Sequence, residues 1–239
     1  MNKQSSYLLP VLLYHRIVKS KAETGKHNIY VTVKRFRRQM EWLRKNQIST
    51  ITFRDIIENP DISFDKKVIL TFDDGYNDNY FNMFPIIREF GFNAVIFLVT
   101  QQHYNSWGVI DGEPNIGLLT NEQIIEMDKY GIEFGSHTQN HFDLTKCNTA
   151  TQMREIAESK RNIESSINKK VVSFSYPFGG LNEEIKNIIK EEGYNFGVAT
   201  KTGPVNFFDD LFQIRRIEVH CKTMLYRFKK KVSGNYYKR

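Results

Sequence analysis

Two adjacent aspartates, Asp73 and Asp74, follow an apolar segment and precede a glycine, so that residues 68–76 read V-I-L-T-F-D-D-G-Y. Asp-Gly is a common turn pair and aspartate also caps helices, which gives this feature a purely structural explanation. The alternative is a site in which the two carboxylates do different work. One would bind a cation, which offsets the repulsion between the two charges, and the other would accept a proton.

A pair of histidines offers further ligands for such a cation. His137 and His141 are four residues apart in S-H-T-Q-N-H, a spacing at which two imidazoles can reach one ion. Most histidine pairs at this spacing are unrelated surface or capping residues, so the pair alone indicates little. Together with an aspartate, two imidazoles form a catalytic divalent-metal site that keeps one position open for water. The chain has no His-Glu-x-x-His motif of the zinc proteases.

Hydrolysis at such a site needs a base and an acid as well as the metal. The metal lowers the pKa of its bound water, the base takes the proton of the attacking water, and the acid protonates the leaving group. We interpret one of the adjacent aspartates as the ligand and the other as the base. His15, which ends the first apolar segment, is a candidate acid, although a histidine at a strand end also occurs without such a role.

The segments that must position these residues alternate between two patterns. Continuous apolar runs, typical of strands covered on both faces, are expected at residues 11–14, 48–53, 68–72, 93–99, 132–135, 171–175, 194–199 and 214–219. Helical periodicity is found at residues 33–43, 79–90, 120–130, 150–168 and 182–192, and a basic helix follows the last strand. Thr32 is the expected N-cap of the first helix, and Gly91, Gly131 and Gly193 are expected to end three others.

About seven strand–helix units predict a parallel barrel covered by helices. Because no Gly/Pro/Ser-rich linker divides the chain, we expect one domain over residues 1–239, with a core at about 10–220 and a basic C-terminal segment at 222–239. The carboxyl ends of the strands of such a barrel meet at one rim, where catalytic residues collect. The candidate polar residues all follow strands, at His15, Asp73-Asp74, Ser136-His137 and residues 176–179, so we expect them to lie close together.

The formal net charge of +7 permits an anionic partner, although solvated helix faces are the commoner explanation of basic clusters. No nucleic-acid-binding motif is found, so we expect no nucleic-acid partner. No segment approaches the ~20 apolar residues of a membrane span, and the N-terminal apolar run is short and broken by Pro10. We therefore expect a cytoplasmic protein whose basic C-terminus contacts a membrane or a lipid-linked glycan.

Two long segments, residues 17–31 and 100–119, are expected to lack regular structure. Loops of this length are usually functional or disordered. Tyr104 and Trp107, in the second segment, are candidates for stacking on sugar rings, with ordinary loop packing as the alternative.

Four motifs together resemble the polysaccharide deacetylases, the NodB-homology proteins of carbohydrate esterase family 4. They are L-L-Y-H-R (12–16), T-F-D-D-G-Y (71–76), S-H-T-x-x-H (136–141) and Y-P-F-G (176–179). The resemblance covers about residues 10–220 and implies a deformed (β/α)7 barrel. It also implies a divalent metal, most often Zn2+, with Co2+, Ni2+, Mn2+ and Fe2+ as alternatives. The implied reaction is hydrolysis of an N-acetyl group on an amino sugar of a polysaccharide or glycan precursor.

The resemblance also implies roles for individual residues. Asp73 corresponds to the base, and the metal ligands correspond to Asp74, His137 and His141. The backbone N–H of Phe178 would bind the oxyanion, and the neighbouring Tyr176 would contact the substrate.

Two departures from the common pattern concern the acid and the arginine that orients the base. Ser175 precedes Tyr-Pro where many members have arginine, so Arg216, or else Arg215, would hold the base instead. The early Tyr-His is similar to the branch that acts on poly-N-acetylglucosamine, which favours His15 as the acid over His220 in the loosely matching Glu-Val-His near the end of the chain.

Other functions stay open at this point. An O-acetyl or N-formyl sugar deacylase would use the same site. A two-His-one-carboxylate iron oxygenase would explain the ligands but not the second aspartate. A non-catalytic carbohydrate-binding homologue would not need the base and the acid.

Overall fold

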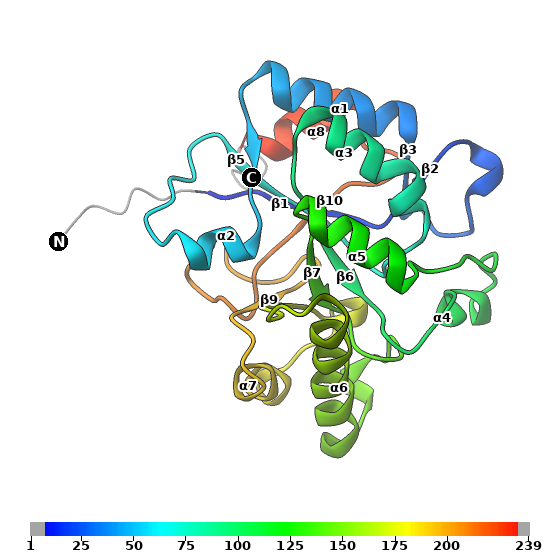
Figure 1. The fold of residues 1–239 in the computed structure, drawn as a ribbon, viewed down its shortest axis with the longest axis vertical. Coiled ribbons are helices and arrows are strands. Elements are labelled where there is room, and N and C mark those ends of the chain that lie inside the picture. Colours follow the sequence, from blue (N-terminus) through cyan, green and yellow to red (C-terminus); the bar gives the residue numbers. More distant parts are fainter. Residues whose placement is uncertain (1–7, 234–239) are drawn as a thin grey trace.

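The centre of the molecule is a curled sheet of parallel strands that closes on itself (Figure 1). The computed structural model describes residues 8–233. Around the sheet the strands follow the order β10-β1-β5-β6-β7-β8-β9. They are β1 (Val11–Tyr14), β5 (Lys67–Phe72), β6 (Val95–Leu98), β7 (Glu133–Ser136), β8 (Ser173–Ser175), β9 (Phe196–Val198) and β10 (Ile217–Glu218). A two-residue strand, β4 (Ser49–Thr50), pairs with the start of β5.

Residues 214–218 join the two edges of this sheet. Ile214 forms a parallel bridge with Val198 of β9, supported by two backbone hydrogen bonds of 2.9 Å. Three residues later, Ile217 pairs with Leu12 of β1. The structure thus confirms the predicted deformed (β/α)7 barrel.

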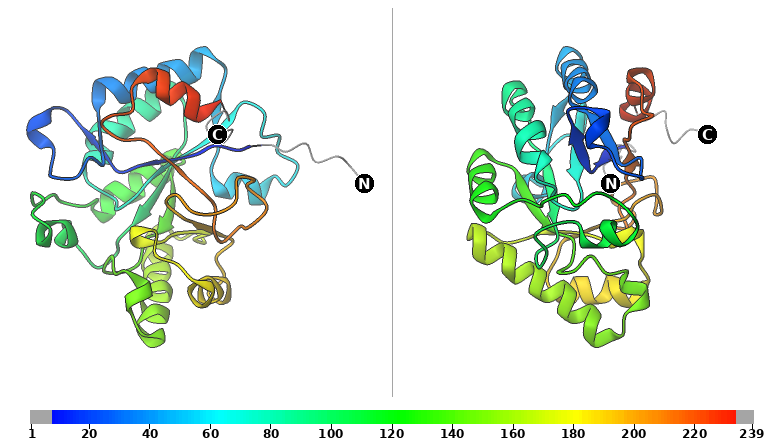
Figure 2. Two further views of the ribbon diagram at one scale, coloured as in Figure 1. Left: turned by 180° about the vertical axis from the view of Figure 1, so that it is seen from behind. Right: turned by 90° about the vertical axis from the view of Figure 1, so that its right-hand side faces the viewer.

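Helices surround the barrel (Figures 1 and 2). They are α1 (Val33–Lys45), α2 (Phe53–Glu58), α3 (Phe84–Phe90), α4 (Ser106–Ile110), α5 (Asn121–Tyr130), α6 (Thr149–Ile167), α7 (Glu183–Glu191) and α8 (Leu225–Val232). A π-helical turn, η2 (Asn79–Met83), leads into α3, and 3-10 turns lie at η1 (Lys21–Glu23), η3 (Leu144–Lys146) and η4 (Pro177–Gly179). Helix α1 packs against α3 and α8, and α6 packs against α5 and α7. No helix within residues 8–233 is long and apolar enough to cross a membrane.

The local sequence signals explain most helix boundaries. The Thr32 side chain accepts the N–H of Arg35 at the start of α1. Gly91 and Gly131 end α3 and α5 in the left-handed conformation, which glycine adopts without steric cost. The predicted strand at 48–53 is wrong in its second half, because Thr52 forms a capping box with Asp55 and Phe53 begins α2.

The two long segments are also more regular than predicted. Residues 17–31 contain η1 and most of a small parallel pair formed by β2 (Arg16–Val18) and β3 (Tyr30–Thr32). Residues 100–119 contain α4 and a bridge between Tyr104 and Gly117. The strand pair and the Tyr104–Gly117 bridge join residues far apart in the sequence, so periodicity does not reveal them.

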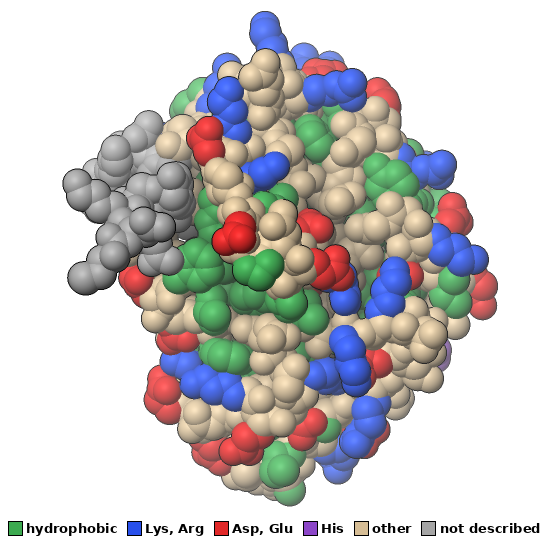
Figure 3. All heavy atoms as spheres, turned by 60° about the vertical axis from the view of Figure 1, so that its left-hand side comes forward, with side chains coloured by type: hydrophobic (Ala, Val, Ile, Leu, Met, Phe, Trp, Pro, Cys, Tyr) green, Lys and Arg blue, Asp and Glu red, His purple; other side chains and the backbone are tan. Residues whose placement is uncertain are grey.

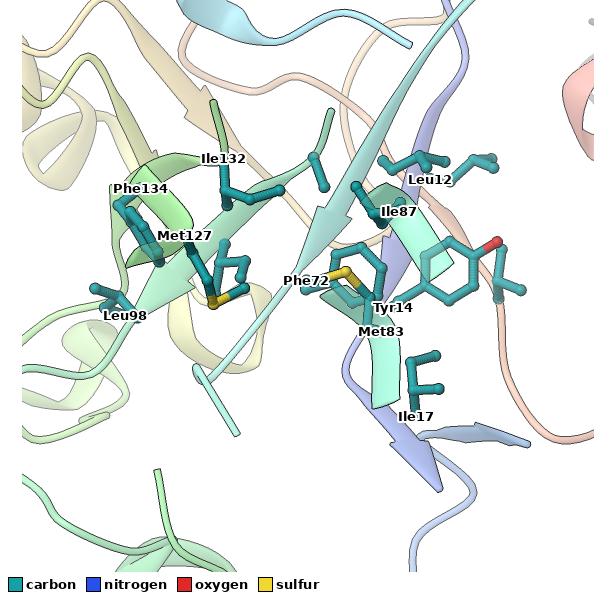
Figure 4. Close-up of a cluster of buried hydrophobic side chains, with 14 of the residues drawn as sticks. Leu12, Tyr14, Ile17, Phe72, Met83, Ile87, Leu98, Met127, Ile132 and Phe134 are labelled. Carbon is teal, nitrogen blue, oxygen red and sulfur yellow. The ribbon is translucent and has the colours of Figure 1, made fainter. Parts of the chain in front are cut away.

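Side chains of each strand alternate between two hydrophobic layers. Leu12, Phe72 and Phe134 point outward into the layer under the helices, together with Met83 and Met127 (Figure 4). Val11, Ile69, Val95 and Phe97 belong to a second cluster, which fills the interior of the barrel. Every second position of a strand therefore faces the interior. The alternation extends one residue beyond the strand, so that a residue such as Asp73 also faces the interior.

The amino-terminal end of the barrel is filled by aromatic side chains. Phe53 of α2 packs 5.1 Å from Phe196 of β9, and Phe64 stacks 5.5 Å from Phe208, measured between ring centroids. Figure 3 shows the face that carries α2, where apolar side chains gather between charged ones. This filled end leaves the opposite, carboxyl end of the strands for polar residues.

One carboxylate, Glu133, is nevertheless buried at the start of β7. It accepts hydrogen bonds from the backbone N–H of Arg54 (2.8 Å), in the first turn of α2, and from the hydroxyl of Ser173 (2.9 Å). Burial raises the pKa of Glu133, and these hydrogen bonds oppose the shift only in part. Its ionised form is therefore less favourable in the fold than in the unfolded chain.

We predict that Glu133→Gln becomes more stable relative to the wild type as the pH rises. A carboxyl whose folded-state pKa is raised stabilises the fold below its ordinary pKa, and that contribution is lost as the pH rises through the folded-state value. The neutral amide does not have this cost. Free energies of unfolding from urea titrations at about pH 4.5 and about pH 8 test the prediction. The control is Glu58→Gln, at an exposed position of α2. A difference between variant and wild type that is independent of pH would contradict it.

Candidate metal centre and active site

Three buried side chains converge at the carboxyl end of the barrel. Asp74 follows β5, His137 follows β7, and His141 lies in the next turn of chain. The Asp74 Oδ1 atom lies 3.3 Å from His137 Nε2 and 3.2 Å from His141 Nε2. Ligands of a tetrahedral zinc ion, at bond lengths of about 2.0–2.2 Å, lie about 3.3–3.6 Å apart. The two distances from Asp74 match this spacing, and all three ligand atoms lie within 4.8 Å of one another, so the group could hold a small divalent cation.

The backbone around these ligands is strained. Asp74, Thr138, His141 and Phe178 have φ angles of 75°, 67°, 59° and 58°, in the left-handed region that non-glycine residues seldom adopt. Gly75 continues the turn at φ 71°, and a side chain there would lie 2.8 Å from Leu98. Such strain clusters at functional sites, where the surrounding structure maintains it. Here it turns Asp74 away from the strand direction and toward the two imidazoles.

A hydrogen bond fixes the orientation of His137. Its Nδ1 lies 2.8 Å from the carbonyl oxygen of Ser175, which requires the proton on Nδ1 and leaves the Nε2 lone pair facing Asp74. Burial lowers the pKa of His137, but the charges of Asp73 and Asp74 outweigh burial and raise it. Two carboxylates thus favour positive charge at this position, and a cation supplies that charge as well as a proton does.

His141 is held by packing instead. The Trp107 ring stacks on its imidazole, with centroids 4.2 Å apart and planes at 18°, and the Phe178 ring meets it edge-on at 4.7 Å. Its buried Nδ1 has no hydrogen-bond partner among the described residues. One face of the Trp107 ring therefore orients His141, a candidate ligand. The predicted stacking of Trp107 on a sugar ring would have to use the other face.

Asp73 has a different partner from its neighbour. Its Oδ1 and Oδ2 atoms accept hydrogen bonds from Arg216 Nη1 (2.6 Å) and Nη2 (2.7 Å), and the Ser175 hydroxyl donates to Oδ2 (3.2 Å). The remaining Arg216 donors reach Ala199 O, the Thr71 hydroxyl and Ser175 Oγ. Burial raises the pKa of Asp73, but the Arg216 charge lowers it below its ordinary range. Asp73 is thus an ionised carboxylate outside the candidate ligand set.

A cavity of about 340 Å³ opens onto both carboxylates. Of the residues predicted from the sequence, it is also lined by His15, His137, His141, Trp107, Tyr176 and Phe178. Tyr104 is 41% exposed and lies outside the lining, and His220 lines a different cavity. The His15 carbonyl oxygen accepts a 2.9 Å hydrogen bond from the buried Asn79 side chain, which fixes the chain at this point.

Sequence reasoning missed several residues that line this cavity, among them Tyr76, Thr200 and Glu218. Tyr76 lies within the T-F-D-D-G-Y motif, and burial raises its pKa, as does the neighbouring Asp74 charge. Glu218 lies two residues after Arg216, so strand alternation alone would have directed it to the interior. Thr200 carries no comparable signal.

The fold and the convergent Asp-His-His group define a parallel barrel with a candidate metal site. A sequence model of the polysaccharide deacetylase family matches residues 63–197. YxkH of Bacillus subtilis, named as a polysaccharide deacetylase, is 31% identical over 214 residues, which cover 88% of this chain and 71% of YxkH. The poly-β-1,6-N-acetyl-D-glucosamine N-deacetylase of Staphylococcus epidermidis is 27% identical over 203 residues, covering 80% of this chain and 68% of that enzyme.

A solved structure shows the same likeness in three dimensions. The deacetylase PplD of Streptococcus pyogenes, in complex with acetate, superposes with a TM-score of 0.81 at 26% identity and covers 94% of this chain and 97% of its own. The chain belongs to the polysaccharide deacetylase family.

We predict that Trp107→Ala weakens zinc binding by about 10–100-fold, because His141 loses the ring that orients it. Trp107→Phe, which keeps an aromatic face, should lose less. The matched control is Trp42→Ala, since Trp42 packs against Phe228, on α8. Competition with a chromophoric chelator measures the affinity independently of activity. Equal zinc affinities of Trp107→Ala and the wild type would exclude an orienting role.

Proposed function

We propose that this protein hydrolyses N-acetyl groups on an amino sugar of a polysaccharide or glycan precursor, releasing acetate and leaving a free amine. The observation that carries the proposal is the separate use of two neighbouring carboxylates. Asp74 joins two imidazoles, whereas Asp73 is held by Arg216 and remains free to accept a proton. A metal-assisted hydrolase needs both a ligand and a base.

Asp74, His137 and His141 would hold zinc, which accepts two imidazoles and one carboxylate as ligands. When bound, it would supply a water of lowered pKa and would polarise the acyl oxygen. Asp73 accepts the proton of the attacking water on a carboxylate oxygen, while the bidentate Arg216 keeps that carboxylate ionised and oriented. The Phe178 N–H donates to the oxygen on which charge develops, and the preceding Pro177 has no N–H to compete.

The acid we propose is His15, which protonates the departing nitrogen. It lines the same cavity as both carboxylates. His220 lines the neighbouring cavity, and its Nδ1 accepts the backbone N–H of Lys222 at 3.3 Å. Position therefore favours His15.

The related proteins support an N-acetylated polysaccharide as the substrate class. One relative is named for removing N-acetyl groups from poly-β-1,6-N-acetyl-D-glucosamine, and a structural relative was solved with acetate, the product of this reaction.

We also propose that the exposed Lys229 and Lys230 of α8 favour contact with an anionic membrane surface or lipid-linked glycan. A cytoplasmic location stays a prediction from the sequence.

We predict zinc-dependent acetate release from N-acetylated β-1,6-glucosamine oligomers, and loss of about 10²–10⁴-fold in kcat for Asp73→Asn, because the base is removed. Asp73→Asn should still bind zinc, whereas Asp74→Asn should lose both zinc and activity. Asp61→Asn, at an exposed position, is the control.

The Asp73→Asn variant leaves the Arg216 charge buried without its counter-ion, so its thermal midpoint and zinc content are measured alongside its rate. A folded, zinc-loaded Asp73→Asn protein with full activity would rule out Asp73 as the base. Release of acetate from O-acetylated but not N-acetylated substrates, or release of formate alone, would assign a different deacylase activity to the same site.

We predict that His15→Ala lowers kcat by about 10²–10⁴-fold, whereas His220→Ala changes it only slightly, because only the first lies beside the carboxylates. Zinc content serves as the control for both variants. The opposite result would assign the acid to His220.

A further inference from the structure

A buried carboxylate of helix α6 contacts the turn that joins the two candidate histidine ligands. Glu155 is fully buried and does not line the active-site cavity. Its Oε2 atom accepts the backbone N–H groups of Gln139 and Asn140, each at 2.9 Å, and its Oε1 atom accepts the Asn140 side-chain amide at 2.7 Å. All three donors belong to the turn between His137 and His141. Because burying a carboxylate is costly without such donors, the turn and Glu155 stabilise each other.

The backbone of this turn is strained on both sides of the contact. Thr138 and His141 have φ angles of 67° and 59°, and the His141 N–H donates to the Thr138 hydroxyl at 2.9 Å. A non-glycine residue stays in this conformation only where the surrounding contacts hold it there. Glu155 supplies such contacts, since it fixes the backbone N–H groups of both residues that lie between Thr138 and His141.

Helix α6 also anchors the start of the turn. Ser159 lies four residues after Glu155, on the same face of the helix, and its hydroxyl oxygen is 2.6 Å from that of Ser136. Both serines are fully buried, and Ser136 immediately precedes His137. One face of α6 therefore contacts the residue before the first candidate ligand and the residues before the second.

On its other side the turn is connected to helix α4 by side-chain hydrogen bonds. Asn140 Oδ1 accepts a hydrogen bond from Gln102 Nε2 at 2.9 Å, and Gln102 Oε1 accepts one from the Ser106 hydroxyl at 2.9 Å. Ser106 is the first residue of α4, and the next residue, Trp107, stacks on the His141 ring. The connection thus leads from α6, through the turn, to the ring that orients a candidate ligand.

Glu155 sets the direction of each hydrogen bond in this connection. A carboxylate only accepts, so Asn140 turns its NH2 group toward Glu155 and its oxygen toward Gln102. Gln102 therefore donates to Asn140 and has its oxygen free to accept from Ser106. The acceptor at one end thus specifies a single arrangement of the two amides and, with it, the contact to α4.

We propose that Glu155 is a positioning residue of the candidate metal site. It fixes the turn that carries His141 and, through Asn140 and Gln102, the helix that carries Trp107. The inference rests on the proposed function only in so far as that function requires the metal site. The alternative is that Glu155 stabilises the turn alone, which predicts a loss of stability without any change in metal binding.

The first experiment measures zinc affinity by competition with a chromophoric chelator, well below the thermal midpoint of each variant. Glu155→Ala should bind zinc about 10–100-fold more weakly, the usual effect of removing a group that orients a metal ligand. Glu155→Gln keeps the shape but turns an NH2 group toward one of the donors, so we expect a loss of about three- to ten-fold. Glu158→Ala is the matched control, since it removes the same charge from a partly exposed position of α6, where the carboxylate pairs with Arg161.

The visible absorption spectrum of the cobalt-loaded protein reports ligand geometry, which a purely structural role would leave unchanged. We expect altered bands in Glu155→Ala and a partial return to the wild-type spectrum in Glu155→Gln. Wild-type zinc affinity and a wild-type cobalt spectrum in folded Glu155→Ala would overturn the proposal, whatever its thermal midpoint. If Glu155→Ala does not fold, the same result for Glu155→Gln would overturn it. Equal weakening in Glu158→Ala would also do so, because it would indicate only diffuse charge.

The second experiment tests the connection to α4. Within the described residues, Gln102 makes no hydrogen bond to a candidate ligand, yet Gln102→Ala should weaken zinc binding about three- to ten-fold, the equivalent of one hydrogen bond. Because Trp107 transmits this effect, the same substitution should cause no further loss in Trp107→Ala. Gln101→Ala, at the exposed neighbouring position, is the control. No loss in the wild-type background, or an equal loss in both backgrounds, would overturn the connection to α4.

A failure of the role of Glu155 is distinguishable from a failure of the proposed function, because zinc affinity is measured without substrate. Zinc binding that depends on Glu155, without acetate release from any acetylated glycan, would refute the proposed function and support the positioning role. Absence of zinc binding by the wild type would refute both.

Discussion

Two carboxylates lie side by side in the interior of this barrel, and each needs its own positive charge. Burying two neighbouring negative charges in one place would be prohibitive without compensation. Asp73 is compensated by Arg216, and Asp74 lies against the two imidazoles with which it forms the candidate cation site. Ile214 and Ile217 of residues 214–218 pair with β9 and β1, so the segment that closes the barrel also carries Arg216, which holds the candidate base.

The alternation of side chains in the strands makes this arrangement compact. Thr71 and Ser173 face the interior, and two residues later so do Asp73 and Ser175, which both contact Arg216. The interior side chains two residues earlier in these strands must therefore be small, so that the guanidinium group of Arg216 fits above them. Gly135 meets the same need, since a side chain there would lie 2.5 Å from the Phe97 ring, over which Arg216 packs at 5.6 Å. The small interior residues and the polar residues that follow them toward the carboxyl end of the strands thus both result from the need to bury Arg216.

Much of this could be read from the sequence, because strand ends and the motifs that follow them are local features. The helix caps, the parallel strands and the candidate metal ligands follow from such signals. The stacking of Trp107 on His141 could not be predicted, because it depends on how a long connecting segment folds back over the barrel. A second cavity was missed for a similar reason, since Lys201 and Arg215 line it together with Lys231 of α8 only once that helix has packed.

The buried pair of Asp73 and Arg216 also discriminates between classes of chemistry. Two imidazoles and one carboxylate would serve an iron oxygenase equally well. Such an enzyme has no use for an ionised carboxylate beside the metal, and a buried ion pair is seldom favoured over apolar packing on grounds of stability alone. An interior that could have been filled with apolar side chains instead holds a bidentate pair that uses every donor of Arg216. Holding a base in its ionised form explains that choice, and hydrolysis requires such a base.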